Sequence, residues 1–363
     1  MKIIHIVGAR PNFMKAAPLI DSLKDRPGVE QVLVHTGQHY DDNMSKVFFE
    51  DLGLPKPDID LEVGSGSHAQ QTAEIMKRIE PILLENAPDM VIVYGDVNST
   101  MATALVCSKL HISLAHVEAG LRSFDRKMPE EINRLLTDQV ADLLFVPSAE
   151  GVENLLREGV ASEKIHLVGN IMIDTLIKLL PGARERRERV LSQVLQSADK
   201  RGYGLVTLHR PSNVDDPDML LLVLNALKNM SSEIPLIFPI HPRTRKKLLE
   251  SRFSTENSKL HIVDPISYLD FLALQSGSKL VVTDSGGIQE ETTYLGVPCL
   301  TLRENTERPI TVTQGTNLIV GRDLEKLHDE VKKILGGDAK SGQVPHLWDG
   351  KTADRIAKIL IAR

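Results

Sequence analysis

Short apolar segments alternate with amphipathic ones along the sequence, and the series starts again after Ile171. This alternation is typical of parallel α/β sheets covered by helices on both faces. We therefore predict an α/β fold with two Rossmann-like, doubly wound parallel-sheet domains. The expected strands lie near residues 2–7, 31–36, 90–94, 113–117 and 143–146 in the first series, and near 203–207, 236–239, 261–263, 280–283 and 299–302 in the second.

The chain length supports the same division. A chain of 363 residues exceeds most single cores and fits two domains of ordinary size. We place the N-terminal domain at 1–170 and the C-terminal domain at 171–351. Residues 352–363 carry apolar side chains at helical spacing, and this helix could pack on either domain, including back on the first.

Composition excludes several classes of protein. Apolar residues make up 42% and charged residues 25%, which is ordinary for a globular protein. The net charge of −6 gives no basic field for nucleic acid, and the apolar runs are too short to span a membrane. Cys107 and Cys299 have apolar neighbours and no metal-ligand spacing, so we interpret them as core thiols. With no signal peptide in the sequence, we expect a cytoplasmic protein without a metal.

Two glycine-containing turns between a strand and a helix predict a phosphate site. Ser285, Gly286 and Gly287 follow the expected strand 280–283, and the next helix directs free N–H groups and its positive dipole end at an anion. Glu290 and Glu291 then lie where ribose hydroxyls would be. Taken alone, an ordinary turn with an N-capping serine explains this segment equally well.

The first strand repeats the design. Gly8 to Asn12 leads into a helix that carries Arg10 and Lys15 near its start. The helix dipole disfavours cations there, so both need an anionic partner, and an anionic ligand is the simplest one.

Polar residues follow the expected strands, where ligands of open parallel sheets bind. They include Asp96, Glu118, His209, Arg210, His241 and the segment 303–308. The candidates for proton transfer are Asp96, Glu118, Glu130 and Glu131. Asp96 could instead cap the helix that begins near Ser99, and Glu131 could simply pair with Arg134. Glu118 is the hardest of the four to explain structurally and is our main catalytic candidate.

Several ordered motifs resemble those of a known family, the non-hydrolysing UDP-N-acetylglucosamine 2-epimerases. The resemblance runs nearly end to end. Its motifs are Gly8-Ala9-Arg10-Pro11 with Lys15, Thr36-Gly37-Gln38-His39, Tyr94-Gly95-Asp96, His116-Val117-Glu118-Ala119-Gly120-Leu121-Arg122, Pro129-Glu130-Glu131-Ile132-Asn133-Arg134, Leu208-His209-Arg210, the segment 284–291, and Thr306-Glu307-Arg308-Pro309.

The resemblance implies a GT-B or glycogen-phosphorylase type fold with a cleft between the domains, and a UDP-binding C-terminal domain. It implies an isomerase that interconverts UDP-GlcNAc and UDP-ManNAc by anti elimination of UDP to 2-acetamidoglucal and syn re-addition. A cytoplasmic homodimer without a cofactor, acting in cell-surface polysaccharide biosynthesis, is the expected context. The implied catalytic residues are Asp96, Glu118, Glu130 and His209, and the implied substrate-binding residues are Arg10, Lys15, Phe271 (uracil), Ser285, Gly286, Gly287 (phosphates), Glu291 (ribose) and Arg308.

Departures from the family pattern leave alternatives open. Gln38, His39, Arg210 and Glu130 match positions near the family's activator pocket, but the residues after His39 differ from the usual ones. The segment 122–128 resembles relatives that act on other UDP-sugars, including diacetamido uronic acids. A hydrolysing epimerase that releases ManNAc, a glycosyltransferase of the same fold and a non-catalytic nucleotide-sugar sensor are the further alternatives.

Overall fold

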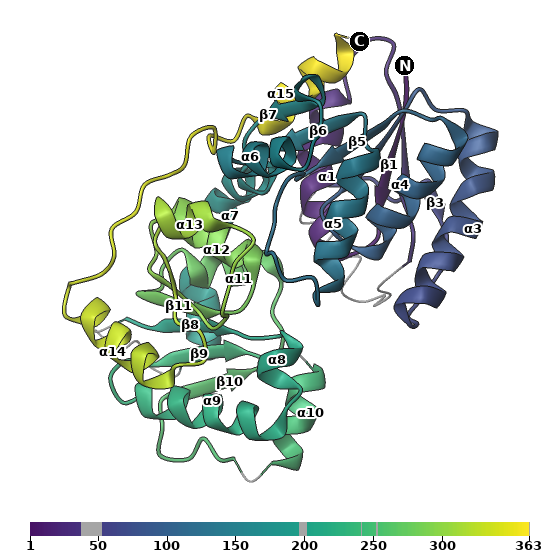
Figure 1. The fold of residues 1–363 in the computed structure, drawn as a ribbon. Coiled ribbons are helices and arrows are strands. Elements are labelled where there is room, and N and C mark those ends of the chain that lie inside the picture. Colours follow the sequence, from purple (N-terminus) through teal and green to yellow (C-terminus); the bar gives the residue numbers. More distant parts are fainter. Residues whose placement is uncertain (38–52, 196–201, 241, 252, 363) are drawn as a thin grey trace. The chain divides into compact units, whose positions relative to one another are not determined.

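The computed structural model describes residues 1–37, 53–195, 202–240, 242–251 and 253–362. The chain divides into two compact units. Met1–Lys178 and His346–Arg363 form the first unit, and Leu179–Pro345 form the second (Figure 1). Within the described ranges, no helix combines the length and the apolar character that a membrane span requires.

The first unit is built on a seven-stranded parallel sheet in the order β3-β2-β1-β4-β5-β6-β7. The strands are β1 (Lys2–Val7), β2 (Glu30–His35), β3 (Ile59–Asp60), β4 (Met90–Tyr94), β5 (Leu114–Val117), β6 (Leu143–Val146) and β7 (Ile165–Leu167). The helices are α1 (Arg10–Leu23), α3 (His68–Asn86), α4 (Asn98–Leu110), α5 (Pro129–Val140), α6 (Ala149–Arg157), the 3-10 helix η1 (Ser162–Lys164) and α15 (Thr352–Ile361).

Helices cover the two faces of this sheet. The chain moves from β1 to β2 in one direction and from β4 to β5 in the other, so right-handed crossovers place α1 and α4 on opposite faces. α3, α4 and α5 pack side by side, while α15 packs on α1 (Figure 1). The central strands β1, β4, β5 and β6 are buried on both faces, which explains their continuous apolar sequences.

The second unit repeats this topology with six parallel strands in the order β10-β9-β8-β11-β12-β13. The strands are β8 (Gly204–Thr207), β9 (Leu236–Pro239), β10 (Leu260–Val263), β11 (Leu280–Thr283), β12 (Cys299–Thr301) and β13 (Asn317–Ile319). The helices are α8 (Pro211–Val214), α9 (Pro217–Met230), α10 (Pro242–Glu250), α11 (Tyr268–Gln275), α12 (Gly286–Leu295), α13 (Pro309–Thr313) and α14 (Leu324–Leu335).

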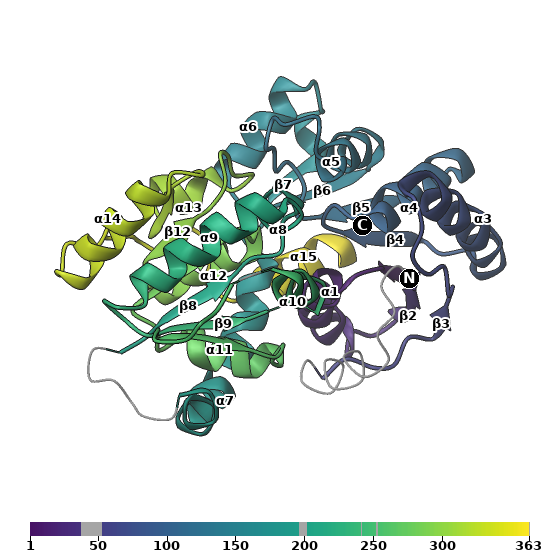
Figure 2. The ribbon, with the colours of Figure 1, turned by 90° about the horizontal axis from the view of Figure 1, so that it is seen from below.

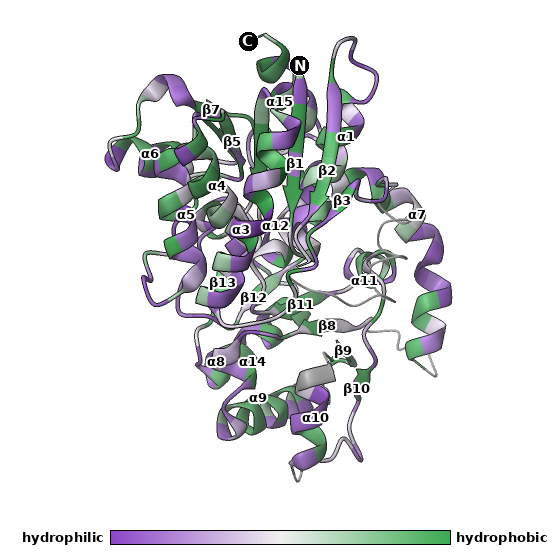
Figure 3. Cartoon of the chain, turned by 90° about the vertical axis from the view of Figure 1, so that its right-hand side faces the viewer, coloured by the Kyte–Doolittle hydropathy of each residue, from purple (hydrophilic) through white to green (hydrophobic). Residues whose placement is uncertain are grey.

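Two apolar clusters lie in the second unit. One joins the sheet to α9 and α14, which lie side by side (Figure 2), and the other joins it to α11 and α12. Figure 3 shows hydrophobic colouring along strands such as β5 and β11, whereas α5 and α7 alternate hydrophilic and hydrophobic stretches. The two sheets confirm the predicted fold class of two doubly wound parallel-sheet α/β units.

Helix α7 (Ile171–Val194) carries the chain from the first unit to the second. Its first residues up to Lys178 belong to the first unit. There Asp174 accepts a hydrogen bond of 2.7 Å from the amide of Ala353, at the start of α15. The indole of Trp348 donates a hydrogen bond of 3.1 Å to the carbonyl of Pro147. These contacts join the C-terminal segment to the first unit.

Candidate active site

In each sheet the chain adds strands first in one direction and then in the other. Ligands of open parallel sheets bind at the point where this direction reverses. In the first unit this point lies between β1 and β4, and in the second between β8 and β11. Asn12 fixes the first of these points, because its side chain accepts hydrogen bonds from the Gly8 and Ala9 amides and donates one of 2.7 Å to the Tyr94 carbonyl. Sequence reasoning gave Asn12 no role of its own.

Lys15 and Glu118 form a buried ion pair at this point of the first sheet. Their side chains are only 6% and 4% exposed, so each charge depends on the other. Sequence reasoning expected an anionic ligand beside Lys15, and in the structure its ammonium contacts the Glu118 carboxylate. A side chain at Gly95 would place its Cβ 2.8 Å from the Lys15 ammonium, which explains the glycine there.

The backbone of Glu118 is strained. Its φ of 77° lies in the left-handed region, which residues other than glycine rarely adopt. Such a conformation costs about 1–3 kcal/mol and persists only when the surroundings enforce it. Strain of this kind at a buried carboxylate directly after β5 supports the choice of Glu118 as the main catalytic candidate.

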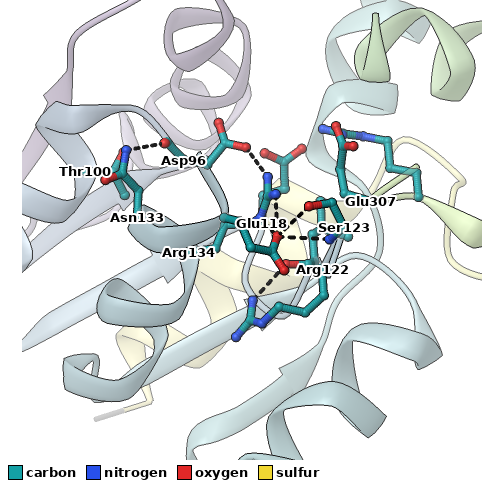
Figure 4. A network of polar contacts seen from close by, with 12 residues as sticks. Asp96, Thr100, Glu118, Arg122, Ser123, Asn133, Arg134 and Glu307 are labelled. Carbon is teal, nitrogen blue, oxygen red and sulfur yellow. Dashed lines mark hydrogen bonds and ion pairs between the residues drawn. The ribbon is translucent and has the colours of Figure 1, made fainter. Parts of the chain in front are cut away.

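Arg134 on α5 connects two of the other carboxylates (Figure 4). It pairs with Asp96, and it pairs with Glu131 at 2.6 Å. The interpretation that Glu131 pairs with Arg134 is therefore confirmed. Capping by Asp96 is wrong, because α4 has Val97 as its N-cap and no side-chain cap, while the Asp96 carboxylate lies against Arg134.

The buried Glu131 also holds the segment that follows β5. Its carboxylate accepts hydrogen bonds from the amides of Ser123 and Phe124, at 2.9 Å each. Burial opposes its ionisation, but the Ser123 amide and Arg134 outweigh this effect and lower its pKa. Its neighbour Glu130 is only half-buried, in the first turn of α5. The residue with access to solvent is thus Glu130, and Glu131 has a structural role.

In the second unit, the buried Asp284 organises the turn after β8. Its carboxylate accepts hydrogen bonds from the amides of His209 and Arg210 and from the side chain of Asn213, at 2.9–3.1 Å. The His209 ring, about half exposed, lies 3.0 Å from the same carboxylate. Burial alone would raise the pKa of Asp284, but His209 and Asn213 lower it. The structure therefore brings His209 to the end of β11, where the predicted phosphate turn begins.

The turn predicted to bind phosphate leads directly into α12, which begins at Gly286. Ser285 occupies the N-cap position, but its hydroxyl does not cap a helix amide. A Cβ at Gly286 would lie 2.4 Å from the Arg308 guanidinium, whereas one at Gly287 would meet nothing within 4 Å. The turn thus has one glycine that the packing requires and one that leaves open space beside the helix start.

The two glutamates of α12 are buried and bonded within the unit. Glu290 pairs with Arg308 at 2.8 Å, and Glu291 accepts a hydrogen bond of 2.8 Å from the Tyr268 hydroxyl. Sequence reasoning placed both where ribose hydroxyls would lie, and the structure gives Glu290 an internal partner. Phe271, half-buried on α11, packs against the apolar cluster on that side of the sheet. Sequence reasoning assigned no role to Tyr268, since nothing local links it to a carboxylate 23 residues away.

Four predicted residues lie wholly or partly beyond what the structure describes. Gln38, His39 and His241 are outside the described residues, and the side chain of Arg10 is not described. Arg210 is described, and its guanidinium lies 3.9 Å from Glu307. Among the described ranges, no three His, Cys, Asp or Glu side chains come together as a metal site.

Comparison with known proteins gives the same family along nearly the whole chain. The family model described as UDP-N-acetylglucosamine 2-epimerase matches residues 21–361. The chain is 45% identical to the UDP-N-acetylglucosamine 2-epimerase of Methanococcus maripaludis, over 94% of this chain and 96% of the relative. It is 41% identical to the UDP-2,3-diacetamido-2,3-dideoxy-D-glucuronate 2-epimerase of Pseudomonas aeruginosa, over 99% of each chain.

Solved structures agree with this result. The crystal structure of Methanocaldococcus jannaschii UDP-GlcNAc 2-epimerase in complex with UDP-GlcNAc and UDP superposes with a TM-score of 0.91, at 44% identity and over 100% of both chains. This neighbour confirms the GT-B type of two Rossmann-like units. The chain is therefore an epimerase and belongs to the UDP-N-acetylglucosamine 2-epimerase family.

Proposed function

We propose that this protein is a non-hydrolysing epimerase that interconverts UDP-GlcNAc and UDP-ManNAc. The observation that carries the proposal is the pair of carboxylates after neighbouring strands, Asp96 after β4 and Glu118 after β5, each held by a cation. A protein that only bound a nucleotide sugar would not need them. The relatives named for this reaction support the same choice.

The chemistry explains why the leaving group matters. The C2 proton of the sugar is not next to a carbonyl, so its direct removal is too difficult. Anti elimination removes UDP and the C2 proton from opposite faces of the sugar and gives 2-acetamidoglucal. Syn re-addition then returns UDP to the face of C1 that it left and adds a proton to that same face at C2, which inverts C2. Elimination requires a base for the C2 proton and positive charge against the departing diphosphate, and preorganised charge of this kind is the largest source of rate.

We assign the proton transfers to the first unit. Asp96, Glu118 and the half-buried Glu130 form the acid/base group. The Lys15 ammonium beside Glu118 and the Asp96–Arg134 pair keep these carboxylates oriented. Arg10 and Lys15 would supply positive charge to the diphosphate.

We assign nucleotide binding to the second unit. The amides at the start of α12, with Ser285, Gly286 and Gly287, suit a diphosphate. Phe271 would stack on uracil, Glu291 would accept from ribose hydroxyls, and His209 and Arg308 would stabilise the leaving UDP. The hydrogen bond from Tyr268 orients the Glu291 carboxylate for that role.

The sugar itself has a second candidate. The Pseudomonas aeruginosa relative, 41% identical over 99% of this chain, is named for a diacetamido glucuronate, and the segment 122–128 resembles such relatives. A UDP-2,3-diacetamido uronic acid is therefore the alternative substrate. The reaction type is the same for both sugars.

The experiment is proton NMR of the protein with UDP-GlcNAc in D2O. We expect deuterium at C2 together with new UDP-ManNAc signals. Accumulation of free ManNAc would instead identify a hydrolysing epimerase, and exchange only with the diacetamido uronic acid would identify the second sugar. Glu118→Gln should lose the exchange, while the exposed Glu153→Gln should keep it. Full activity of Glu118→Gln would show that the role given to this carboxylate is wrong.

The cellular context belongs to the same proposal. We infer a cytoplasmic homodimer that supplies an activated amino sugar for cell-surface polysaccharide, with no cofactor. Gln38, His39 and Arg210 are proposed to form an activator site for UDP-GlcNAc. Sedimentation would test the dimer, and rates measured at rising UDP-GlcNAc concentration would test the activator.

A further inference from the structure

Asp138 is a buried aspartate on α5 for which the proposed reaction has no use. Its side chain is fully buried, and both oxygens accept hydrogen bonds. Oδ1 lies 2.7 Å from Nδ1 of His116, and Oδ2 lies 3.1 Å from the amide of Gly120 and 2.7 Å from the Arg122 guanidinium. One carboxylate thus contacts residues on both sides of Glu118.

His116 extends this cluster to the end of the neighbouring strand. Its Nε2 lies 2.8 Å from the carbonyl of Gly95, the residue before Asp96. Both ring nitrogens therefore face acceptors, and the ring donates to both at once only when it is protonated. Through these two contacts His116 joins the ends of β4 and β5.

The backbone around Glu118 needs such support. Glu118 has a φ of 77° and Gly120 a φ of 81°, so two residues of this segment lie in the left-handed region. A Cβ at Gly120 would lie 2.5 Å from the Gly151 carbonyl, so the segment is also packed closely from the other side. Arg122 closes the cluster by pairing with Glu158 through two hydrogen bonds, of 2.8 and 2.6 Å.

We propose that Asp138 is a positioning residue for Glu118. Through His116, Gly120 and Arg122 it holds the segment 116–122 in the strained backbone that directs the Glu118 carboxylate at the reacting sugar. The inference rests on the proposed function, because it concerns the carboxylate that takes part in proton transfer at C2. The competing explanation is a buried ion cluster that only stabilises the fold.

The test is Asp138→Asn, which keeps the shape of the side chain and removes its charge. We expect kcat for UDP-GlcNAc epimerisation to fall about 100-fold, the effect of moving a reacting group by about 1 Å. KM and UDP affinity should stay within about threefold, since Asp138 contacts His116, Gly120 and Arg122, and the uracil and ribose contacts are assigned to the second unit. Rates are expressed per UDP-binding site counted by calorimetric titration, which removes the effect of misfolded protein. A crystal structure of the variant should show a changed φ at Glu118.

Two controls separate positioning from stability. Asp174→Asn alters another buried carboxylate of the same unit that contacts α15, and Leu83→Ala removes a fully buried core side chain. Both should keep wild-type kcat per UDP-binding site, whatever their melting temperatures. His116→Gln is the second test variant, because it removes one of the two ring donors, and its kcat should fall as for Asp138→Asn.

The proposal is wrong if Asp138→Asn and His116→Gln keep kcat within about threefold of wild type per binding site, a change too small for a displaced reacting group. It is also wrong if Leu83→Ala loses kcat to the same extent, or if neither test variant folds, because the cluster then serves stability. A wild-type protein that exchanges no C2 proton would overturn the proposed function, and this inference with it.

Discussion

Asp174 gives the sharpest prediction about stability. It is buried in the first turn of α7 and accepts a hydrogen bond from the Ala353 amide. Burial raises its pKa from the ordinary 3.8 to about 6, and the amides of Ala353 and Thr352 and the charge of Arg355 only partly oppose this change. The ionised carboxylate is therefore less favourable in the folded protein than in the unfolded chain.

The sign of the pH dependence follows from proton binding. Between pH 3.8 and about 6 the folded state binds more protons at Asp174 than the unfolded state does, so stability falls as pH rises through this window. At ~1.4 kcal/mol for each pKa unit, the full penalty is ~3 kcal/mol above pH 7 and ~1.5 kcal/mol at pH 5. Asp174→Asn removes this penalty, and its oxygen can still accept from the Ala353 amide.

The assay is urea denaturation followed by the fluorescence of Trp348, the single tryptophan of the chain. Trp348 is buried in the same unit as Asp174, so its fluorescence reports the relevant unfolding step. We expect the free energy of unfolding of Asp174→Asn to exceed that of wild type by ~3 kcal/mol at pH 8 and by ~1.5 kcal/mol at pH 5. The exposed Asp25→Asn is the matched control and should show no such trend. A pH-independent difference, or a less stable Asp174→Asn at pH 8, would refute the reasoning.

Three further predictions concern side-chain contacts within each of the two units. Lys15→Met or Glu118→Gln should each destabilise the first unit by ~3 kcal/mol, because each leaves a buried charge without its ion-pair partner. The double variant should lose less than the sum, which a double-mutant cycle with Trp348 fluorescence would measure. Gly286→Ala should weaken UDP binding at least about tenfold, because its Cβ displaces the Arg308 guanidinium, whereas Gly287→Ala should change the affinity less than about threefold. Calorimetric titration with UDP compares the two, and equal affinities would contradict the packing argument. Tyr268→Phe should cost the second unit ~1–3 kcal/mol by removing the donor to the buried Glu291 carboxylate, as seen by scanning calorimetry. An unchanged second-unit transition would show that the bond contributes little.

Much of the fold could be predicted because its central strands are buried on both faces. Continuous apolar runs such as 90–94 and 280–283 coincide with β4 and β11. The strands that sequence reasoning missed are β3, β7 and β13, which lie at sheet edges and have two or three residues each. So short a segment carries no periodicity, and only its pairing with a neighbouring strand defines it.

The functional residues divide in the same way. Residues just after a strand could be predicted from local sequence. As expected, Asp96, Glu118 and Ser285 lie just after β4, β5 and β11. Their partners could not be predicted, because they are distant in sequence. Glu118 lies 103 residues from Lys15, and Asp284 lies 75 residues from the His209 amide. The helix dipole predicts an anionic partner for Lys15. Only the folded structure shows that Glu118, which follows β5, lies beside it.

The two units hold their site segments by the same physical device. Asp138 in the first unit and Asp284 in the second are buried carboxylates that accept backbone amides of the segment after a strand. Burial opposes ionisation in both, yet His116 with Arg122, and His209 with Asn213, lower their pKa values. Both carboxylates therefore stay ionised on mild acidification, while Asp174 beside α15 takes up a proton near pH 6. Mild acidification should therefore leave the hydrogen bonds from the backbone amides to Asp138 and Asp284 intact, so the segments after β5 and β8 keep their conformation.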